Sequence, residues 1–561
     1  MLKNGAEIIL ECLLEQEITT IFGYPGGAIL NIYDALYKYS DKIKHILTAH
    51  EQGATHAADG YARSTGKPSV VLTTSGPGAT NTVTGIATAY MDSIPMIVIT
   101  GNVATNNIGL DSFQEINITG ITMPITKHNF LVRDISELAD TIRKAFKIAT
   151  SGRKGPVLID IPKDITSATY EYIPKANHQK NQEKTIFPHQ NIREAIELIN
   201  NSKRPFIYTG GGCNIPNNAN IEIKILAKKL NAPVSSSLMG QGSFDNFDDQ
   251  YIGMLGLHGT KTASTTLMNC DLFIAIGTRL SDRVALNTKK FALNAKIIQI
   301  DIDESEINKN IKVDCSIIGD VKSVLYKING SIVERQDTIW MKQIQHWCNE
   351  YHLDQLPINE DDITPKQFIE TLCNLTKGNA IISTEVGQHQ MWTAQYYKFR
   401  YPKQFLTSGG LGTMGFGLGC AIGAKIANPN KTVINIAGDG SFHMNCNELI
   451  TLKRYNIPII EIIFNNQVLG MVRQWQRLIY NKRFSQTTLG NNVNFAKLAE
   501  AYDIMFYKIS TPTDIEYILK KALKNNSPTI IEVPINKDMN VLPMAHAKRD
   551  INDPIMTIDI D

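Results

Sequence analysis

Short runs of apolar, often β-branched residues alternate with longer segments of helical periodicity through most of the chain. Runs of roughly four to eight apolar residues bounded by glycine or proline are typical of buried strands. Nine runs predict strands on this basis, at 70–74, 94–101, 156–162, 204–212, 272–279, 296–303, 432–440, 458–466 and 528–535. Their alternation with helices predicts an α/β fold of parallel, doubly wound sheets.

Two polar stretches, at 167–190 and 333–365, interrupt this rhythm and are interpreted as linkers. They divide the chain into three doubly wound parallel-sheet domains, 1–165, 190–335 and 365–540, followed by a tail over 541–561 that we expect to be weakly ordered from about Ala545. A length of 561 residues agrees with several domains rather than one.

Composition and charge narrow the class of protein. Apolar residues make up 43% of the chain and charged residues 20%, which predicts a globular fold. A net charge of +2, with basic residues scattered along the chain, gives no reason to expect a nucleic acid or an anionic membrane as partner. No apolar run reaches about 18 residues, so no membrane-spanning helix is expected. Small-molecule partners are therefore expected.

The N-terminal sequence and the cysteine pattern favour a cytoplasmic location. The first 18 residues alternate acids with apolar residues as an amphipathic helix does, and they lack the pattern of a signal peptide. The eight cysteines form no CxxC pair and do not cluster with histidines at zinc spacing. A reducing compartment is the expectation that fits these features.

Glycine-rich turns join a strand to a helix in both the first and the third domain, as TSGPGATN at 74–81 and AGDGSFHMN at 437–445. Such turns place backbone amides at a helix N-terminus, where anions bind favourably. The alternative is that doubly wound domains need glycines at strand-to-helix corners in any case.

The second of these turns has a partner on the next strand. Asp439 follows the strand at 432–438, and Asn466 ends the run at 458–466. If the two strands are neighbours, both side chains lie at the carboxyl edge of the sheet, where α/β domains bind ligands. Carboxylate and amide oxygens suit Mg²⁺, which completes its coordination with water and phosphate. The spacing predicts a magnesium diphosphate site; the alternative is a capping aspartate and a turn asparagine.

GDG followed by NN resembles the diphosphate signature of thiamine diphosphate enzymes. The resemblance implies that Mg²⁺ is bound by Asp439, by the side chain of Asn466 and by the backbone carbonyl of Val468. It also implies that thiamine diphosphate is contacted by Gln388, His389, Met414, Gly438, Gly440, Ser441 and Met471. Met414 would hold the cofactor in its bent shape, although an ordinary core methionine is the alternative.

The stretch HEQGATHAADGYA, at 50–62, predicts a helix of small residues that begins with one carboxylate, Glu51. In thiamine diphosphate enzymes a glutamate of the N-terminal domain bonds a pyrimidine nitrogen and favours the tautomer that removes the thiazolium proton. The resemblance assigns this role to Glu51, with Ala54 and Ala58 on the same helix face leaving space for a ring or another backbone. The alternative is a first-turn acid that stabilises the helix dipole. Because the two halves of each cofactor site come from different subunits in this family, a homodimer is implied.

Further stretches are similar to the catalytic subunit of the acetohydroxyacid synthase family, the biosynthetic acetolactate synthases. They include FGYPGGAIL, FQE, GMLGLHGT, SDRV, GGLGTMGFGLG and NNQVLGMVRQWQRLIY. The resemblance implies a transferase that decarboxylates pyruvate and joins the two-carbon unit to a second pyruvate, giving 2-acetolactate, or to 2-ketobutyrate, giving 2-aceto-2-hydroxybutyrate. These products lead to valine, leucine and isoleucine. A small regulatory subunit is the implied partner.

The same resemblance assigns the substrate channel. Phe113, Gln114 and Lys163 would line the channel to the reacting carbon, and Arg283, Val472 and Trp475 would contact the substrates. Arg283 would bind the carboxylate of the second substrate, which suits a planar guanidinium. Trp475 would favour 2-ketobutyrate over pyruvate as acceptor. The alternatives are a solvated loop lysine for Lys163, a surface ion pair for Arg283 and a buried helix tryptophan for Trp475.

The middle domain of this family binds FAD, although the reaction has no net redox step. The residues implied are Arg153, Gly211, Gly212, His258, Gly259, Gly277, Arg279, Asp301 and Asp320. For the glycines, packing at strand ends is the alternative. Two other classes of protein are the alternatives to a carboligase: a flavin-linked pyruvate oxidase of the same domain plan, and a non-catalytic thiamine-fold binding module.

Overall fold

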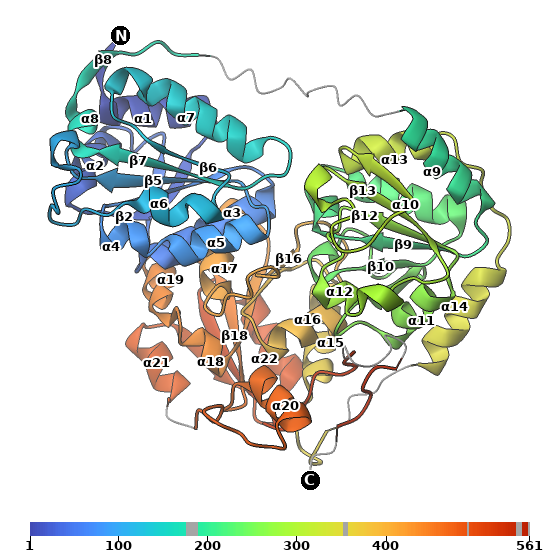
Figure 1. The fold of residues 1–561 in the computed structure, drawn as a ribbon. Helices are drawn as coiled ribbons and strands as arrows, with labels where there is room; N and C mark the ends of the chain where they lie inside the picture. The colour runs from blue at the N-terminus through green and yellow to red at the C-terminus, as the bar shows by residue number, and fades with distance from the viewer. Residues whose placement is uncertain (176–188, 352–356, 491–492, 546–552, 559–561) are drawn as a thin grey trace.

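The structure, a computed structural model, describes residues 1–175, 189–351, 357–490, 493–545 and 553–558. These residues form three six-stranded sheets in which all neighbouring strands are parallel, each flanked by helices (Figure 1). All nine predicted runs contain strands. The predicted fold class, three doubly wound α/β domains, is therefore confirmed.

The N-terminal domain is built from β2 (Thr20–Tyr24), β3 (Lys44–Leu47), β4 (Ser69–Thr73), β5 (Met96–Asn102), β6 (His128–Leu131), β7 (Pro156–Pro162), α1 (Gly5–Glu15), α2 (Leu30–Lys38), α3 (Glu51–Thr65), α4 (Pro77–Thr80), α5 (Val83–Met91), α6 (Ile118–Thr122), α7 (Ile135–Thr150) and α8 (Lys163–Ser167). Its sheet has the order β3-β2-β4-β5-β7-β6. Val70 packs under α1, α2 and α7 on one face, and Val71 packs under α3 and α5 on the other, since successive side chains of a strand point to opposite faces. The short strands β1 (Leu2–Asn4) and β8 (Thr169–Glu171) pair antiparallel.

The middle domain contains β9 (Pro205–Thr209), β10 (Val234–Ser236), β11 (Tyr251–Met254), β12 (Leu272–Ile276), β13 (Lys296–Asp301), β14 (Cys315–Ile318), α9 (His189–Asn201), α10 (Ala219–Leu230), α11 (Lys261–Asn269), α12 (Asp282–Ala285), α13 (Val321–Asn329) and α14 (Ile339–Glu350). The sheet order is β11-β10-β9-β12-β13-β14. The helices α9, α10 and α13 cover one face, and α11 and α14 cover the other.

One interpretation of the sequence was wrong. The stretch 333–365 is not only a linker, because α14 lies within it and packs on the middle domain. Trp340 and Ile344 are buried there, and the Trp340 indole nitrogen donates to the Pro205 carbonyl at 3.0 Å. The apolar residues at 340, 341, 344 and 347 recur at helical spacing and form the face by which α14 docks. Of the other predicted linker, 167–190, residues 176–188 lie outside the described residues.

The C-terminal domain contains β15 (Ile381–Thr384), β16 (Phe405–Leu406), β17 (Val433–Gly438), β18 (Ile459–Asn465), β19 (Met505–Lys508), β20 (Thr529–Pro534), α15 (Pro365–Thr376), α16 (Gln388–Tyr396), α17 (Gly417–Ala427), α18 (Asp439–Phe442), α19 (Leu449–Tyr455), α20 (Gly470–Ile479), α21 (Phe495–Ala501) and α22 (Asp514–Lys524). The sheet order is β16-β15-β17-β18-β20-β19. The helices α15, α16 and α22 lie on one face, and α17, α19 and α21 lie on the other.

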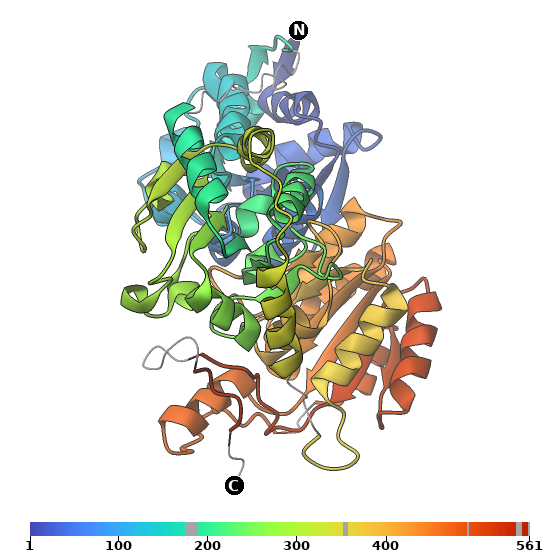
Figure 2. The ribbon, with the colours of Figure 1, turned by 90° about the vertical axis from the view of Figure 1, so that its right-hand side faces the viewer.

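The N-terminal and C-terminal domains share a hydrophobic core between α3 and α17, which lie side by side in Figure 1. Small residues allow the close approach: a Cβ at Gly423 would collide with the Ala57 carbonyl, and a Cβ at Gly60 would collide with the Cys420 carbonyl. The C-terminal domain lies below the other two in Figure 1 and again in the turned view of Figure 2. The helix that begins at Glu51 is thus an interdomain element.

The strands of the three six-stranded sheets fall within the predicted domain ranges, whose exact boundaries remain predictions, whereas β8 lies in the stretch 167–190 that was interpreted as a linker. The first residues of the predicted tail, 541–545, are largely buried, and the Ala545 N–H donates to the Leu257 carbonyl at 2.7 Å. Residues 546–552 and 559–561 lie outside the described residues. Among the described helices, none is both long enough and apolar enough to cross a bilayer.

Candidate active site

A cavity of about 2230 Å³ lies between the three domains. All nine residues predicted to bind FAD line it, namely Arg153, Gly211, Gly212, His258, Gly259, Gly277, Arg279, Asp301 and Asp320. Several of them lie at or within three residues of the carboxyl ends of β9, β12 and β13, which are adjacent parallel strands, and ligands of doubly wound folds bind at this edge. The volume exceeds the roughly 300–1,000 Å³ of ordinary ligand pockets, so a dinucleotide and a second small molecule fit its size.

The glycines Gly211, Gly212 and Gly277 of this cavity differ in what an added Cβ would contact. A Cβ at Gly212 would lie 2.9 Å from the Gly277 Cα, and Gly277 has a φ of +57°. These two glycines therefore permit close backbone packing, the alternative considered from the sequence. A Cβ at Gly211 would instead meet the Met239 side chain at 3.1 Å.

The two arginines predicted to bind FAD, Arg153 and Arg279, both make contacts between domains. The Arg153 Nε donates to the Ser93 hydroxyl at 2.8 Å, and its Nη1 pairs with Glu306 of the middle domain at 2.8 Å. Arg279 donates from Nη1 to the Met91 carbonyl at 2.9 Å. The cavity wall is thus tied to the turn 91–93 of the N-terminal domain.

Burial shifts the pKa of two further residues predicted to bind FAD, His258 and Asp301. Burial lowers the pKa of His258 to about 4, so its imidazole is neutral near pH 7. Burial also raises the pKa of Asp301 to about 6. Asp320 caps α13 by accepting the Ser323 N–H at 2.9 Å. All three residues line the cavity, but His258 and Asp301 are also buried by the protein and Asp320 is engaged in a helix cap.

The predicted diphosphate residues meet at the carboxyl edge of the C-terminal sheet. The strands β17 and β18 pair with Gly438 opposite Phe464, which places Asp439 and Asn466 beyond adjacent strand ends. Asn466 accepts the Val468 N–H at 3.2 Å and donates to the Gln388 Oε1 at 3.4 Å. The structure brings these predicted residues together, together with Ser441, whose hydroxyl accepts the Gly438 N–H at 3.3 Å.

Two buried polar atoms at this edge have no hydrogen-bond partner among the described residues: the Asp439 Oδ1 and the His389 Nε2. Burial raises the pKa of Asp439 to about 6 and lowers that of His389 to about 3. An unsatisfied buried polar atom costs free energy, so these atoms call for a ligand. A divalent cation at Asp439 and an anionic oxygen near His389 fit them. The Gln388 Nε2 is already used, by Gln474 at 3.1 Å and the Met539 carbonyl at 3.0 Å.

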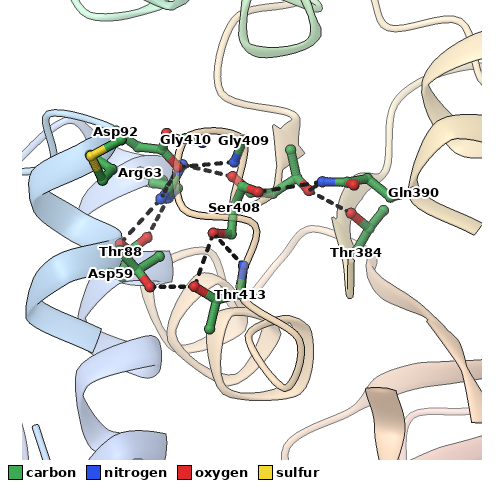
Figure 3. Close-up of polar contacts among 12 residues, drawn as sticks. Asp59, Arg63, Thr88, Asp92, Thr384, Gln390, Ser408, Gly409, Gly410 and Thr413 are labelled. Carbon is green, nitrogen blue, oxygen red and sulfur yellow. Dashed lines mark hydrogen bonds and ion pairs between the residues drawn. The ribbon is translucent and has the colours of Figure 1, made fainter. Parts of the chain in front are cut away.

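The loop that carries Met414, residues 407–416, is held from the N-terminal domain (Figure 3). Asp92 accepts the N–H groups of Gly409 at 3.1 Å and Gly410 at 2.8 Å, and the hydroxyls of Thr88 and Thr413 lie 2.7 Å apart. A loop with this many glycines has few side chains of its own to fix it. Contacts from another domain therefore define its shape.

A buried charge cluster stands behind these contacts. Arg63 bonds to Asp59, one helical turn earlier, and donates to Asp92 at 2.9 Å and to the Thr407 carbonyl at 2.9 Å (Figure 3). The side chain of Arg63 is 5% exposed, and those of Asp59 and Asp92 are fully buried. This cluster was not predicted, although an Asp and an Arg four residues apart in a helix of small residues indicate a paired charge.

Glu51 begins α3 and is buried. Its Oε2 accepts a hydrogen bond from the Asn81 amide at 3.0 Å, and a Cβ at Gly78 would lie 3.3 Å from its Oε1. Gln114 lies beside the same turn, since a Cβ at Gly76 would meet the Gln114 Cβ at 2.9 Å. The structure therefore gathers two predicted residues, Glu51 and Gln114, around the TSGPGATN turn.

Other predicted residues are open to solvent in the single chain. Phe113 is 88% exposed and Val472 is 50% exposed, and Lys163, at the start of α8, is also exposed. Arg283 lines the cavity with a side chain 70% exposed, 3.8 Å from Asp282, which is the surface pair considered as its alternative. Met471 and Trp475, four residues apart on α20, line the same cavity.

The predicted thiamine diphosphate residues thus form two groups. Within the described residues, the Glu51 carboxylate is hydrogen-bonded to Asn81, and no hydrogen bond or ion pair joins it to Asp439 or Asn466. The Glu51 group belongs to the N-terminal domain and the Asp439 group to the C-terminal domain.

Comparison with known proteins assigns the three domains. Residues 3–121 match the N-terminal TPP binding domain of thiamine pyrophosphate enzymes, residues 192–328 the central domain, and residues 385–533 the C-terminal TPP binding domain. Fold and site together define a thiamine pyrophosphate enzyme. The chain belongs to the family of acetolactate synthase large subunits.

Three relatives illustrate the likeness. The acetolactate synthase large subunit of Buchnera aphidicola subsp. Schizaphis graminum is 46% identical over 555 residues, covering 96% of each chain. That of Haemophilus influenzae is 42% identical over 565 residues, covering 99% of this chain and 98% of the relative. The isozyme 3 large subunit of Escherichia coli is 43% identical over 559 residues, covering 96% of each. The predicted family resemblance is therefore confirmed.

Proposed function

We propose that this chain decarboxylates pyruvate and joins the remaining two-carbon unit to a second pyruvate or to 2-ketobutyrate. The observation that carries the proposal is the pair Asp439 and Asn466 at adjacent strand ends, with the Asp439 Oδ1 unpaired within the described part of the chain, in a chain of this family. The products would be 2-acetolactate and 2-aceto-2-hydroxybutyrate, precursors of branched-chain amino acids.

The cofactor contacts follow from the donors at the sheet edge. Asp439, Asn466 and the Val468 carbonyl would hold Mg²⁺, since all three offer hard oxygen atoms. Gly438, Gly440, Ser441, Gln388 and His389 would surround the diphosphate. The chemistry that thiamine diphosphate supplies when bound is an electron sink for the decarboxylation. Met414 and Met471 would contact its rings.

The chain's own residues act on protons and on substrate carboxylates. Glu51 would share a proton with the pyrimidine ring and so keep the required tautomer, in a site from which its burial excludes water. Gln114, Phe113 and Lys163 would line the approach to the reacting carbon. Arg283 would bind the carboxylate of the acceptor, and Val472 and Trp475 would contact its alkyl end.

FAD would occupy the interdomain cavity without changing its oxidation state. Two pyruvates and a proton give 2-acetolactate and CO₂: one C–C bond breaks, another forms, and no oxidant is consumed. The lining of the cavity by all nine predicted residues supports FAD binding there. A pyruvate oxidase would instead pass electrons to the flavin.

A direct assay separates these two functions. Purified protein with Mg²⁺, thiamine diphosphate, FAD and pyruvate is expected to form acetolactate, measured colorimetrically, with no oxygen uptake at an electrode. Peroxide formation or quinone reduction in place of acetolactate would contradict the carboligase. If the loaded protein forms neither acetolactate nor an oxidation product, the result would favour a non-catalytic binding module instead.

A homodimer completes the site in this proposal. The Glu51 group of one chain would face the Asp439 group of its partner, and the exposed Phe113 would be covered there. Relatives are named large subunits, and a small regulatory subunit is proposed as a further partner. A cytoplasmic location fits a soluble biosynthetic enzyme and belongs to the same proposal.

Mixed dimers test the shared site. Glu51→Gln and Asp439→Ala are each expected to be inactive alone, the first without its proton partner and the second without cofactor binding. Mixed after denaturation and refolding, the two chains should regain about a quarter of the wild-type activity per chain, because half of the dimers are mixed and each of these holds one intact site. No recovery, with wild-type chains refolded in parallel as control, would place both residues in sites within one chain.

A further inference from the structure

The backbone just before Glu51 is held by a carboxylate of the other domain. Glu448, the last residue of the 3-10 turn Cys446–Glu448, accepts the Ala49 N–H at 3.1 Å and the His50 N–H at 3.1 Å. It also accepts the Thr451 hydroxyl at 2.6 Å. Glu448 is fully buried, so all its contacts are with protein. Three donors converge on one carboxylate. An ionised carboxylate has no proton to donate, so all of its hydrogen bonds are accepted ones.

Two residues of α19, the helix that follows Glu448, also hold the backbone ahead of Glu51. The Tyr455 hydroxyl accepts the Leu47 N–H at 2.8 Å, and Arg454 donates to the Leu47 carbonyl at 2.8 Å. On the helix side, a Cβ at Gly53 would collide with the Glu448 carboxylate, so the glycine makes room for it. The start of α3 is therefore shaped to receive Glu448.

We infer that Glu448 is a positioning residue for Glu51: it fixes the backbone at Ala49 and His50 and thereby the direction in which the Glu51 carboxylate leaves α3. The inference rests on the proposed function of Glu51. The first N–H groups of a helix have no partner within the helix. His50 caps α3 internally by accepting the Gln52 N–H at 3.1 Å, and Glu448 holds the two residues ahead from outside. The role of Glu448 is thus to transmit the position of the C-terminal domain to Glu51.

The test separates positioning of Glu51 from cofactor anchoring. Glu448→Gln replaces one acceptor oxygen with an amide that opposes the backbone N–H donors. Exchange of the thiazolium proton of bound thiamine diphosphate with deuterium, followed by NMR after acid quench, is expected to slow by about 10–100-fold. Binding of Mg²⁺ and thiamine diphosphate, followed by titration calorimetry, should be unchanged. Exchange at the wild-type rate, or equal loss of binding and exchange, would overturn the inference.

A second variant disturbs the same contact from the helix side. Gly53→Ala leaves Glu448 in place and improves helix propensity, yet its Cβ displaces the carboxylate, so exchange should slow likewise. Gly53→Ala decides the matter if Glu448→Gln does not fold. Glu461→Gln is the matched control: Glu461 is also a fully buried glutamate of this domain, bonded to Asn435 at 2.9 Å, and its substitution should leave exchange unchanged.

Glu51→Gln in the same assay distinguishes the two levels of the argument. Wild-type exchange in Glu51→Gln would refute the proposed role of Glu51 and the inference with it. Slow exchange in Glu51→Gln with normal exchange in both Glu448→Gln and Gly53→Ala would overturn only the inference about Glu448.

Discussion

Replacing Glu51 by Gln is expected to lower turnover of pyruvate by about 10²–10⁴-fold, the usual contribution of a positioned proton-transfer group. Gln has the same shape and can keep the hydrogen bond from Asn81 at Glu51, so the fold should persist. It cannot take up the proton that the carboxylate shares with the pyrimidine. Turnover, with thiamine diphosphate affinity measured on the same sample, checks this, and affinity is expected to stay near wild type.

Glu7→Gln is the matched control for this experiment. Glu7 also lies in the first turn of a helix, α1, and belongs to its capping box. If Glu51 served only the helix dipole, both changes would cost about 0.3–1 kcal/mol of stability and leave turnover unchanged. Near-normal turnover in Glu51→Gln would therefore contradict the assignment.

Replacing Arg63 by Met is expected to lower the free energy of unfolding by about 3–5 kcal/mol, because it leaves the carboxylates of Asp59 and Asp92 buried without a counter-charge. The Thr407 carbonyl also loses its donor. Guanidinium titration followed by fluorescence measures the change. The loop of Met414 should lose order with it, since Asp92 holds Gly409 and Gly410.

An exposed pair of the same spacing provides the control. Lys520 and Glu516 are also four residues apart on one helix, with side chains 57% and 61% exposed. Lys520→Met is expected to cost about 0.3–0.5 kcal/mol. Equal losses in the two variants would contradict a special contribution of the buried cluster. Adding Asp59→Asn and Asp92→Asn to Arg63→Met should return part of the loss, because no unpaired charge then remains buried.

Nine of the twelve central strands could be predicted because they are buried on both faces and read as continuous apolar runs, whereas the central strands β2, β10 and β15 were not predicted. The six edge strands escaped: β3 (KHIL), β6 (HNFL), β11 (YIGM), β14 (CSII), β16 (FL) and β19 (MFYK) have only two to four residues each. Their partner is a single neighbouring strand, which local sequence does not reveal. The helix α14 escaped because the stretch 333–365 was interpreted as polar as a whole, although its apolar residues at 340, 341, 344 and 347 have the spacing of an amphipathic helix.

The candidate site divides in the same way. Motifs that combine a strand end with a glycine turn, such as those at Asp439 and Gly211, point to their position within the fold. Residues that act across domains have no such local signal. Glu448 ends a 3-10 turn in one domain and holds the start of a helix of another, and Asp92 follows α5 while holding a loop far along the chain. Only the packing of α3 on α17 brings these partners together.

Three consecutive residues of the N-terminal domain, Met91, Asp92 and Ser93, bond to different neighbours: Arg279 of the middle domain, the backbone of Gly409 and Gly410, and Arg153. This turn therefore connects the N-terminal domain to both of the other domains. A chimaera that exchanges one domain with a relative must keep the matching turn, arginines and glycine loop as a set. Each domain has a fold of its own, but the contacts between the domains depend on residues from all three.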